Sequence, residues 1–264
     1  MKGLIKYSLT CAIGISSMFF FQSCSDDDNG IGEEGTANLK IMLTDAPASY
    51  DAVNIDVQGI EIDRGNGLES IALTNPGVYN LLEFNNGMDT LIADANLPTG
   101  TISQLRLILG PNNTIVVDGV QHPLETPSAM QSGLKININQ TLLPNQAYTL
   151  WLDFDAGRSI LQTGNGSYKL KPVMRAYTEL TNGRIEGIVL PTAANATVYA
   201  FNALDTFSAI PNGDGFFAIS GLPADTYSVL FDADSTTVYR DTTITGVGVT
   251  FGNVNNIGTI TVPQ

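Results

Sequence analysis

The residues best suited to chemistry lie in one predicted strand, residues 147–155. Successive side chains of a strand point to opposite faces, so its odd positions place Trp151, Asp153 and Asp155 together. Trp151, the only tryptophan, could stack on a sugar ring while the two carboxylates bind hydroxyl groups. We therefore consider this face a possible ligand-binding site, with packing of Trp151 under a loop as the alternative. The even positions are apolar and should face a core: Tyr148, Leu150, Leu152 and Phe154.

The same carboxylates also raise the question of catalysis. Residues two apart on a strand lie about 6.6 Å apart, close to the separation of paired glycosidase acids. Nothing in the sequence indicates a cleft or a raised carboxyl pKa around Asp153 and Asp155. Asp155 also has a structural role available, as the N-cap of a short helical turn at 156–161. We expect no catalytic residue and a protein that is not an enzyme.

Metal and cofactor sites have little support elsewhere. His122 is the only histidine, and zinc would need carboxylates alone beside it. Asp45 and the segment 212–215 could offer oxygens to calcium, but the segment lacks the spacing of a calcium loop. We favour an Asx turn at Asp45 and a hairpin turn at 212–215. No phosphate-binding loop, nucleophile elbow or zinc-protease motif occurs, so we expect no metal and no cofactor.

The N-terminus has the parts of an export signal. Lys2 and Lys6 precede an apolar run at 9–21 that is too short to span a membrane comfortably. The run ends in Phe21-Gln22-Ser23-Cys24, which resembles a bacterial lipobox, although Phe21 and Gln22 depart from the strict pattern. In a lipobox the cysteine is lipidated and becomes the new N-terminus. The next residues resemble the acidic export signal of Bacteroidetes surface lipoproteins: Ser25, Asp26, Asp27 and Asp28.

These resemblances imply a signal peptide at 1–23 and a lipidated, acidic tether at 24–36. The protein would be anchored in the outer membrane through lipid on Cys24, facing the cell exterior. An uncleaved anchor helix and a soluble secreted protein are the alternatives. Cys11 would leave with the signal, so neither of the two cysteines would remain free for a disulfide or a metal.

The acidic charge of the chain argues against two kinds of partner, nucleic acid and anionic lipid. Loss of Lys2 and Lys6 with the signal changes the formal net charge from −14 to −16. The sequence has no basic stripe, which argues against nucleic-acid binding and against electrostatic attraction to anionic lipid.

Strand periodicity dominates the chain from Ala37 onward, and no segment has helix-length periodicity. The apolar phase moves from odd positions at 53–57 to even positions at 60–62, so Gln58-Gly59 should form a β-bulge. Further strands are expected at 39–43, 105–109, 114–120, 134–138, 147–154 and 168–177.

A second region begins near Asn182. Its predicted strands lie at 184–189, 197–201, 216–219, 226–231, 242–244 and 257–262, and this density over about 80 residues is typical of a small β-sandwich. We therefore predict an all-β protein with two antiparallel β-sandwich-like domains, 37–181 and 182–264.

Both regions resemble known families. Residues 37–180 resemble the domain-of-unknown-function 4382 family in the phrases 43–47 (LTDAP), 118–119 (DG), 126–128 (TPS), 133–135 (GLK) and 152–173. That resemblance implies a β-rich module of secreted and lipid-anchored bacterial proteins, with no established activity. Residues 183–264 resemble the carboxypeptidase-regulatory-like, transthyretin-like sandwich in 183–189, 214–219 and 221–227. That resemblance implies a non-catalytic accessory module.

The leading hypothesis is a surface-exposed outer-membrane lipoprotein with a non-catalytic binding or structural role. One alternative is a subunit of a surface assembly, similar to the two-sandwich fimbrillins, that adds strands at an open sheet edge. Another is a glycan-binding protein using the Trp151 face, and the partner is then a glycan or another surface protein.

Overall fold

The computed structural model describes residues 35–126 and 132–264. The predicted signal peptide, Cys24 and the acidic residues Ser25, Asp26, Asp27 and Asp28 lie outside the described residues. Among the described residues, no helix has the length and apolar character needed to cross a membrane.

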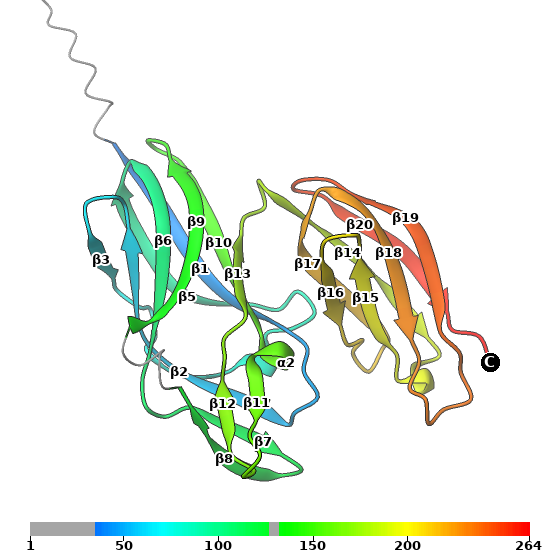
Figure 1. The fold of residues 1–264 in the computed structure, drawn as a ribbon. Coiled ribbons are helices and arrows are strands. Elements are labelled where there is room, and N and C mark those ends of the chain that lie inside the picture. Colours follow the sequence, from blue (N-terminus) through cyan, green and yellow to red (C-terminus); the bar gives the residue numbers. More distant parts are fainter. Residues whose placement is uncertain (1–34, 127–131) are drawn as a thin grey trace, which may run out of the picture. The chain divides into compact units, whose positions relative to one another are not determined.

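The described residues of the first β region form thirteen strands in two sheets, and Figure 1 shows their arrangement. One sheet has the order β13-β10-β1-β5. The other has the order β11-β12-β8-β7-β2-β6-β9, and β3 and β4 also pair with β2. The strands are β1 (Thr36–Ala46), β2 (Ala52–Asp63), β3 (Leu68–Ile71), β4 (Gly77–Asn80), β5 (Thr90–Pro98), β6 (Gly100–Leu109), β7 (Thr114–Val117), β8 (Val120–Glu125), β9 (Leu134–Leu142), β10 (Ala147–Asp155), β11 (Ile160–Gln162), β12 (Tyr168–Leu170) and β13 (Met174–Tyr177). The 3-10 helix η1 (Leu81–Glu83) and the short helix α2 (Ala156–Ser159) connect strands.

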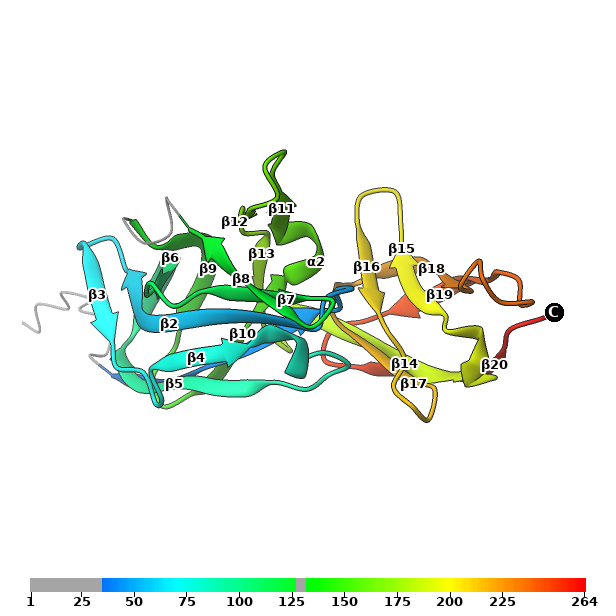
Figure 2. The same cartoon turned by 90° about the horizontal axis from the view of Figure 1, so that it is seen from below.

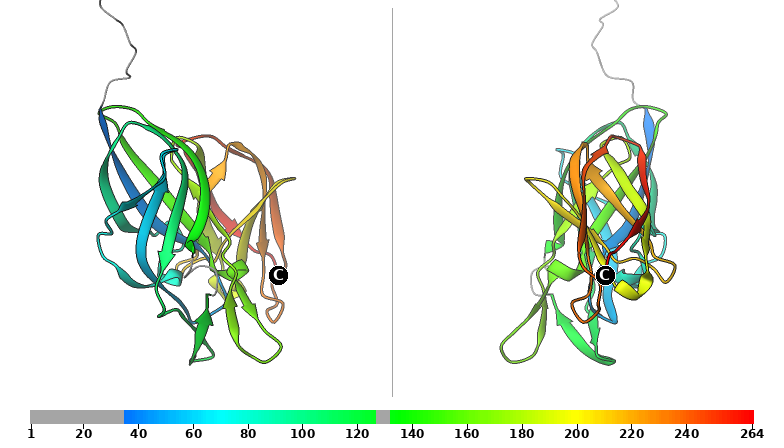
Figure 3. Two further views of the ribbon diagram at one scale, coloured as in Figure 1. Left: turned by 60° about the vertical axis from the view of Figure 1, so that its left-hand side comes forward. Right: turned by 90° about the vertical axis from the view of Figure 1, so that its right-hand side faces the viewer.

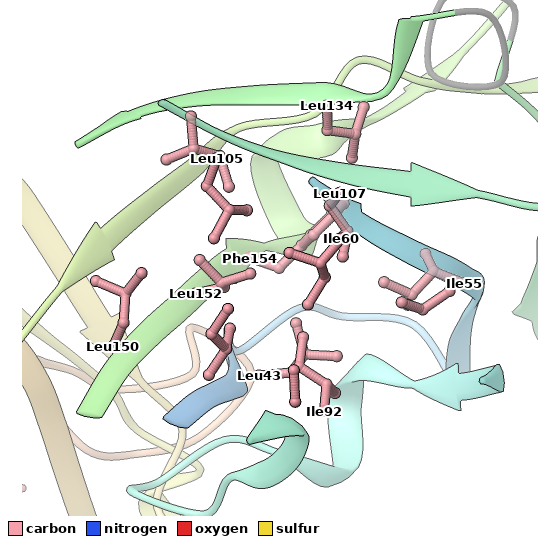
Figure 4. Close-up of a cluster of buried hydrophobic side chains, with 14 of the residues drawn as sticks. Leu43, Ile55, Ile60, Ile92, Leu105, Leu107, Leu134, Leu150, Leu152 and Phe154 are labelled. Carbon is pink, nitrogen blue, oxygen red and sulfur yellow. The ribbon is translucent and has the colours of Figure 1, made fainter. Parts of the chain in front are cut away.

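The core of this region lies between the two sheets. Leu43, Leu152 and Phe154 from one sheet are fully buried. They meet Ile60 and Leu107 from the other sheet in a single apolar cluster (Figure 4). Each of these strands alternates apolar and polar residues, so one face of each sheet can be buried without burying charge.

The second β region is a seven-stranded sandwich, coloured from yellow-green to red in Figure 3. Its sheets have the orders β17-β14-β20 and β16-β15-β18-β19. The elements are β14 (Asn182–Leu190), η2 (Thr192–Ala194), β15 (Thr197–Phe201), β16 (Thr206–Ala209), β17 (Phe216–Pro223), β18 (Asp225–Asp232), β19 (Thr242–Val249) and β20 (Val254–Thr261). A separate apolar cluster, with Phe217, Tyr227 and Phe231 fully buried, fills the space between these sheets.

The all-β sandwich-like class is confirmed, and so is the bulge, because the pairing of β2 with β6 shifts register between Val57 and Gly59. The predicted strand 168–177 is wrong as one element, since it divides into β12 and β13 around Pro172, which cannot donate to a sheet ladder. The predicted strand 114–120 also divides, at a tight turn where Asp118 and Gly119 both have positive φ.

Three strand pairs are parallel within the otherwise antiparallel sheets: β1 with β10, β8 with β12 and β14 with β20. All described residues belong to one compact unit, although the two regions have separate cores. Figure 2 gives a second view of the strands. The domain boundary between 181 and 182 stays a prediction.

Candidate functional site

The strand with the candidate site residues has the expected alternation. The even positions of β10 are buried, with Leu152 and Phe154 at 0% exposure. On the other face, Trp151 and Asp155 are partly exposed, whereas Asp153 is buried. The three candidate residues therefore differ in access to solvent, and each has a different set of partners.

Asp153 is held by an arginine. The Arg175 Nε donates to Asp153 Oδ2 over 2.6 Å, and Arg175 Nη2 lies 2.5 Å from the same oxygen. Strands β10 and β13 place the two residues directly opposite each other. Loss of either member of a buried ion pair leaves the other charge unpaired in a low dielectric, which is strongly destabilising. We therefore assign Asp153 a structural role.

Asp155 is the N-cap of α2. Its carboxylate accepts a hydrogen bond of 2.8 Å from the Arg158 N–H. This confirms the predicted cap, although the helix ends at Ser159, two residues before the expected end. Partial burial raises the Asp155 pKa, while the bond from Arg158 opposes the rise.

A third carboxylate, Asp45, lies at the end of β1 on the core face. It continues the buried series Leu39, Ile41 and Leu43, and is only 6% exposed. Its Oδ1 accepts from the Ala156 N–H at 2.9 Å, and its Oδ2 has no hydrogen-bond partner among the described residues. Burial raises the pKa of Asp45 to about 9, and the negative charges of Asp153 and Asp155 add to the rise. Asp45 is therefore neutral at pH 7.

These three carboxylates line a cavity of about 590 Å³, to which the exposed Asp205 also contributes. Two of them hold structure through Arg175 and Arg158, and the third is shielded from solvent. Across residues 35–126 and 132–264, no group of three or more His, Cys, Asp or Glu side chains is arranged to hold a metal ion. The contacts of Asp153 and Asp155 stabilise the end of β10 and α2.

A second, smaller cavity of about 270 Å³ lies beside Trp151. The indole stacks on the Tyr177 ring, with centroids 5.7 Å apart and planes 7° from parallel. The indole Nε1 donates to Asp89 Oδ2 over 2.6 Å. Glu179 also lines this cavity. Asp153 and Asp155 line the adjoining larger cavity and not the Trp151 cavity.

The Trp151 cavity is lined by exposed side chains of both polar and apolar type. Met88 and Val254 line it and are 62% and 57% exposed. The loop that carries Met88 is fixed, because Thr44 Oγ1 contacts the carbonyl oxygens of Phe84 and Met88 at 2.8 and 3.0 Å. The cavity thus combines two stacked rings, two carboxylates, the Arg184 guanidinium and the exposed apolar side chains of Met88 and Val254.

Sequence reasoning found Trp151 but missed Asp89, Tyr177 and Glu179. Tyr177 lies opposite Trp151 only because of the β10–β13 register, which alternation in one strand cannot reveal. Asp89 follows the predicted turn at 85–87, so its place in a loop was foreseeable, but its partner was not. His122, the lone histidine, packs against the Tyr168 ring with centroids 5.2 Å apart.

Comparison with known proteins identifies the first region. Residues 36–172 match the family model described as Domain of unknown function (DUF4382). The chain belongs to the DUF4382 family. No curated protein matches the chain.

Solved structures give only distant likenesses. The chain is 13% identical to the Bacillus anthracis TIE protein, covering 87% of this chain and 34% of that one, with a TM-score of 0.23. For a shaft pilin, spaA, from Lactobacillus rhamnosus GG the values are 9% identity, coverage of 88% and 97%, and a TM-score of 0.22. For a fimbrial protein from Bacteroides ovatus the identity is 7%, the coverage is 88% of this chain and 51% of that one, and the TM-score is 0.23. The chain thus spans about a third of the TIE protein, and TM-scores of this size do not establish a shared fold.

The DUF4382 match includes Trp151 and Asp89 but ends before Arg175 and Tyr177. Strand β13, which carries both later residues, nevertheless completes the sheet of the DUF4382 region by pairing with β10. The structural region is therefore longer than the matched residues, and both candidate cavities depend on this added strand.

Proposed function

We propose that this DUF4382 protein is a lipid-anchored, surface-exposed outer-membrane protein of the Bacteroidetes type, with a non-catalytic binding role. The lipobox-like segment ending at Cys24 and the acidic residues after it support the anchor and its outward orientation. The carboxypeptidase-regulatory-like phrases of residues 183–264 support an accessory role for the second region.

The observation that carries a binding role is the Trp151 cavity. Two parallel rings offer an apolar platform to the C–H face of a sugar, and Asp89 and Glu179 offer acceptors to its hydroxyl groups. The ligand class that fits is a neutral glycan. The carboxylates of Asp89 and Glu179 would repel an acidic one, and the Arg184 guanidinium, which also lines the cavity, is already paired with Glu186. The proposed site retains Trp151 of the site predicted from the sequence. Its carboxylates, however, are Asp89 and Glu179 instead of Asp153 and Asp155.

Three of the four carboxylates that line the larger cavity, all except the exposed Asp205, argue against an enzyme. A glycosidase needs one acid free to donate its proton and a second, ionised carboxylate free to attack or activate water. Here Asp153 is paired with Arg175, Asp155 caps α2, and the unpartnered oxygen of Asp45 is shielded from solvent.

A glycan array with the full chain in mild detergent tests the proposal. We expect binding to neutral glycans, lost in Trp151→Ala and weakened in Glu179→Gln. Phe251→Ala is the matched control, because Phe251 is 58% exposed and does not line the cavity. An array on which the wild type binds nothing, or on which Trp151→Ala binds as well as wild type, would contradict the glycan site.

Strand addition in a surface assembly is the second candidate, and the composition of two edge strands favours it. Strands β19 and β20 are at the ends of their sheets, and residues 242–264 contain no charged side chain. Edge strands that avoid pairing usually carry charges. We expect Thr243→Lys and Thr259→Lys, at exposed positions of β19 and β20, to reduce self-association in sedimentation velocity. A wild-type chain that stays monomeric at high concentration would argue against assembly.

A further inference from the structure

Arg175 connects the two β regions through one side chain. Besides its bonds to Asp153, its Nη1 donates to the Gly221 carbonyl at 3.0 Å, and its Nη2 donates to the Ser220 carbonyl at 3.1 Å. Its guanidinium carbon lies 4.2 Å from the centroid of the Phe207 ring on β16. A planar guanidinium donates from a rigid fork and can stack flat on a ring, whereas the compact ammonium of lysine has neither the fork nor a plane to stack.

The two carbonyl groups belong to a bend in β17 that forms part of the Trp151 cavity. Gly221 has φ +71°, and a Cβ there would lie 2.6 Å from the Tyr177 ring. The Asn182 Nδ2 donates to the same Gly221 carbonyl at 2.8 Å. Ser220 and Gly221 line the cavity together with Trp151 and Tyr177. The bend therefore contacts the ring on which Trp151 stacks, and glycine is required for so close an approach.

We propose that Arg175 is a positioning residue for the Trp151 cavity: it holds the β17 bend against Tyr177, so that the two β regions together form the binding site. The predicted effect of Arg175 on ligand binding rests on the proposed glycan site, whereas its predicted effect on the contact between the β17 bend and Tyr177 does not. Asp153 orients the guanidinium by its ion pair, which gives this buried carboxylate a role in binding without contact to ligand. The aromatic contact with Phe207 holds the same guanidinium from the side of the second region.

The test uses the full chain in mild detergent and the fluorescence of Trp151, the only tryptophan. Arg175→Lys retains the positive charge beside Asp153 but cannot make the forked bonds to Ser220 and Gly221. We expect Trp151 emission to move to longer wavelength and acrylamide quenching to increase, while far-UV circular dichroism remains that of the wild type. Arg158→Lys is the matched control, since Arg158 is 70% exposed and lies 3.7 Å from Asp155; it should change neither measurement.

Gly221→Ala approaches the same contact from the other side and should also expose Trp151. Quenching that is unchanged in Arg175→Lys overturns the proposal, even if Gly221→Ala increases it, because Tyr177 packing alone would then hold the bend. Should Arg175→Lys fail to fold, Asp153→Asn replaces it, because this variant removes the carboxylate that orients the guanidinium. Unchanged quenching in Asp153→Asn would equally overturn the proposal.

The glycan array separates this inference from the proposed function. Suppose that the wild type binds a glycan and that Arg175→Lys lowers the affinity at least about tenfold, a loss of roughly 1.4 kcal/mol. This result supports both the glycan site and the positioning role of Arg175. If the wild type binds no glycan while Arg175→Lys still exposes Trp151, the glycan proposal fails and the positioning role stands. Full glycan binding by Arg175→Lys overturns the positioning role.

Discussion

The buried carboxyl of Asp45 predicts that the folded protein becomes less stable as pH rises. Burial raises its pKa from 3.8 to about 9. Between these values the folded state retains a proton that the unfolded state has lost. The free energy of unfolding then falls with pH, by about 1.4 kcal/mol per pH unit for one proton. This contribution is fully present below the unfolded pKa and is lost as pH rises through the folded pKa.

The perturbation is Asp45→Asn, which keeps an oxygen to accept from the Ala156 N–H but cannot ionise. From pH 6 to pH 8, the unfolding free energy of the wild type should fall by roughly 3 kcal/mol relative to this variant. Urea unfolding at the two pH values measures both proteins, and other titrating groups cancel in the difference. Asp45→Asn should therefore gain stability relative to the wild type as pH rises.

Asp118→Asn is the matched control, because Asp118 is exposed in a turn with positive φ that asparagine also tolerates. Its stability relative to the wild type should not depend on pH over this range. If the difference between wild type and Asp45→Asn changes by less than about 0.5 kcal/mol, the size of an ordinary surface effect, then the folded protein holds Asp45 ionised and our account of its burial is wrong.

The remaining predictions concern the anchor, the boundary and the tryptophan. Cys24→Ala should abolish incorporation of radiolabelled palmitate and release the protein from the membrane; unchanged labelling would refute the lipid anchor. Fragments 37–181 and 182–264 should each be soluble and β-rich by circular dichroism, because each region has its own apolar core; if neither folds alone, the boundary is wrong. Trp151→Ala should cost about 1–3 kcal/mol, less than the 3–5 of a fully buried tryptophan, because the side chain is only partly buried; urea unfolding with no measurable loss would show that its stacking on Tyr177 contributes nothing.

Alternation within single strands predicted much of this fold. It gave the buried face of β10 and the bulge at Gln58-Gly59, since both depend on residues adjacent in sequence. The same alternation places Asp45 after Leu39, Ile41 and Leu43 on a core face. The burial of Asp45 could thus have been predicted, but its hydrogen bond to Ala156 could not. That contact requires the parallel pairing of β1 with β10, strands separated by about a hundred residues, and no local pattern specifies such a pairing.

The candidate site depends on pairings of the same kind. Aspartates of identical intrinsic chemistry differ here because Asp153 meets Arg175 across two strands, whereas Asp89 meets Trp151 through a loop. The charge of Asp153 is neutralised by Arg175, whereas the charge of Asp89 lies beside the aromatic cavity. Spacing along β10 suggested that Trp151 and Asp153 act on one ligand. The structure instead separates a ring that can contact ligand from a carboxylate that can act on the ligand only through Arg175.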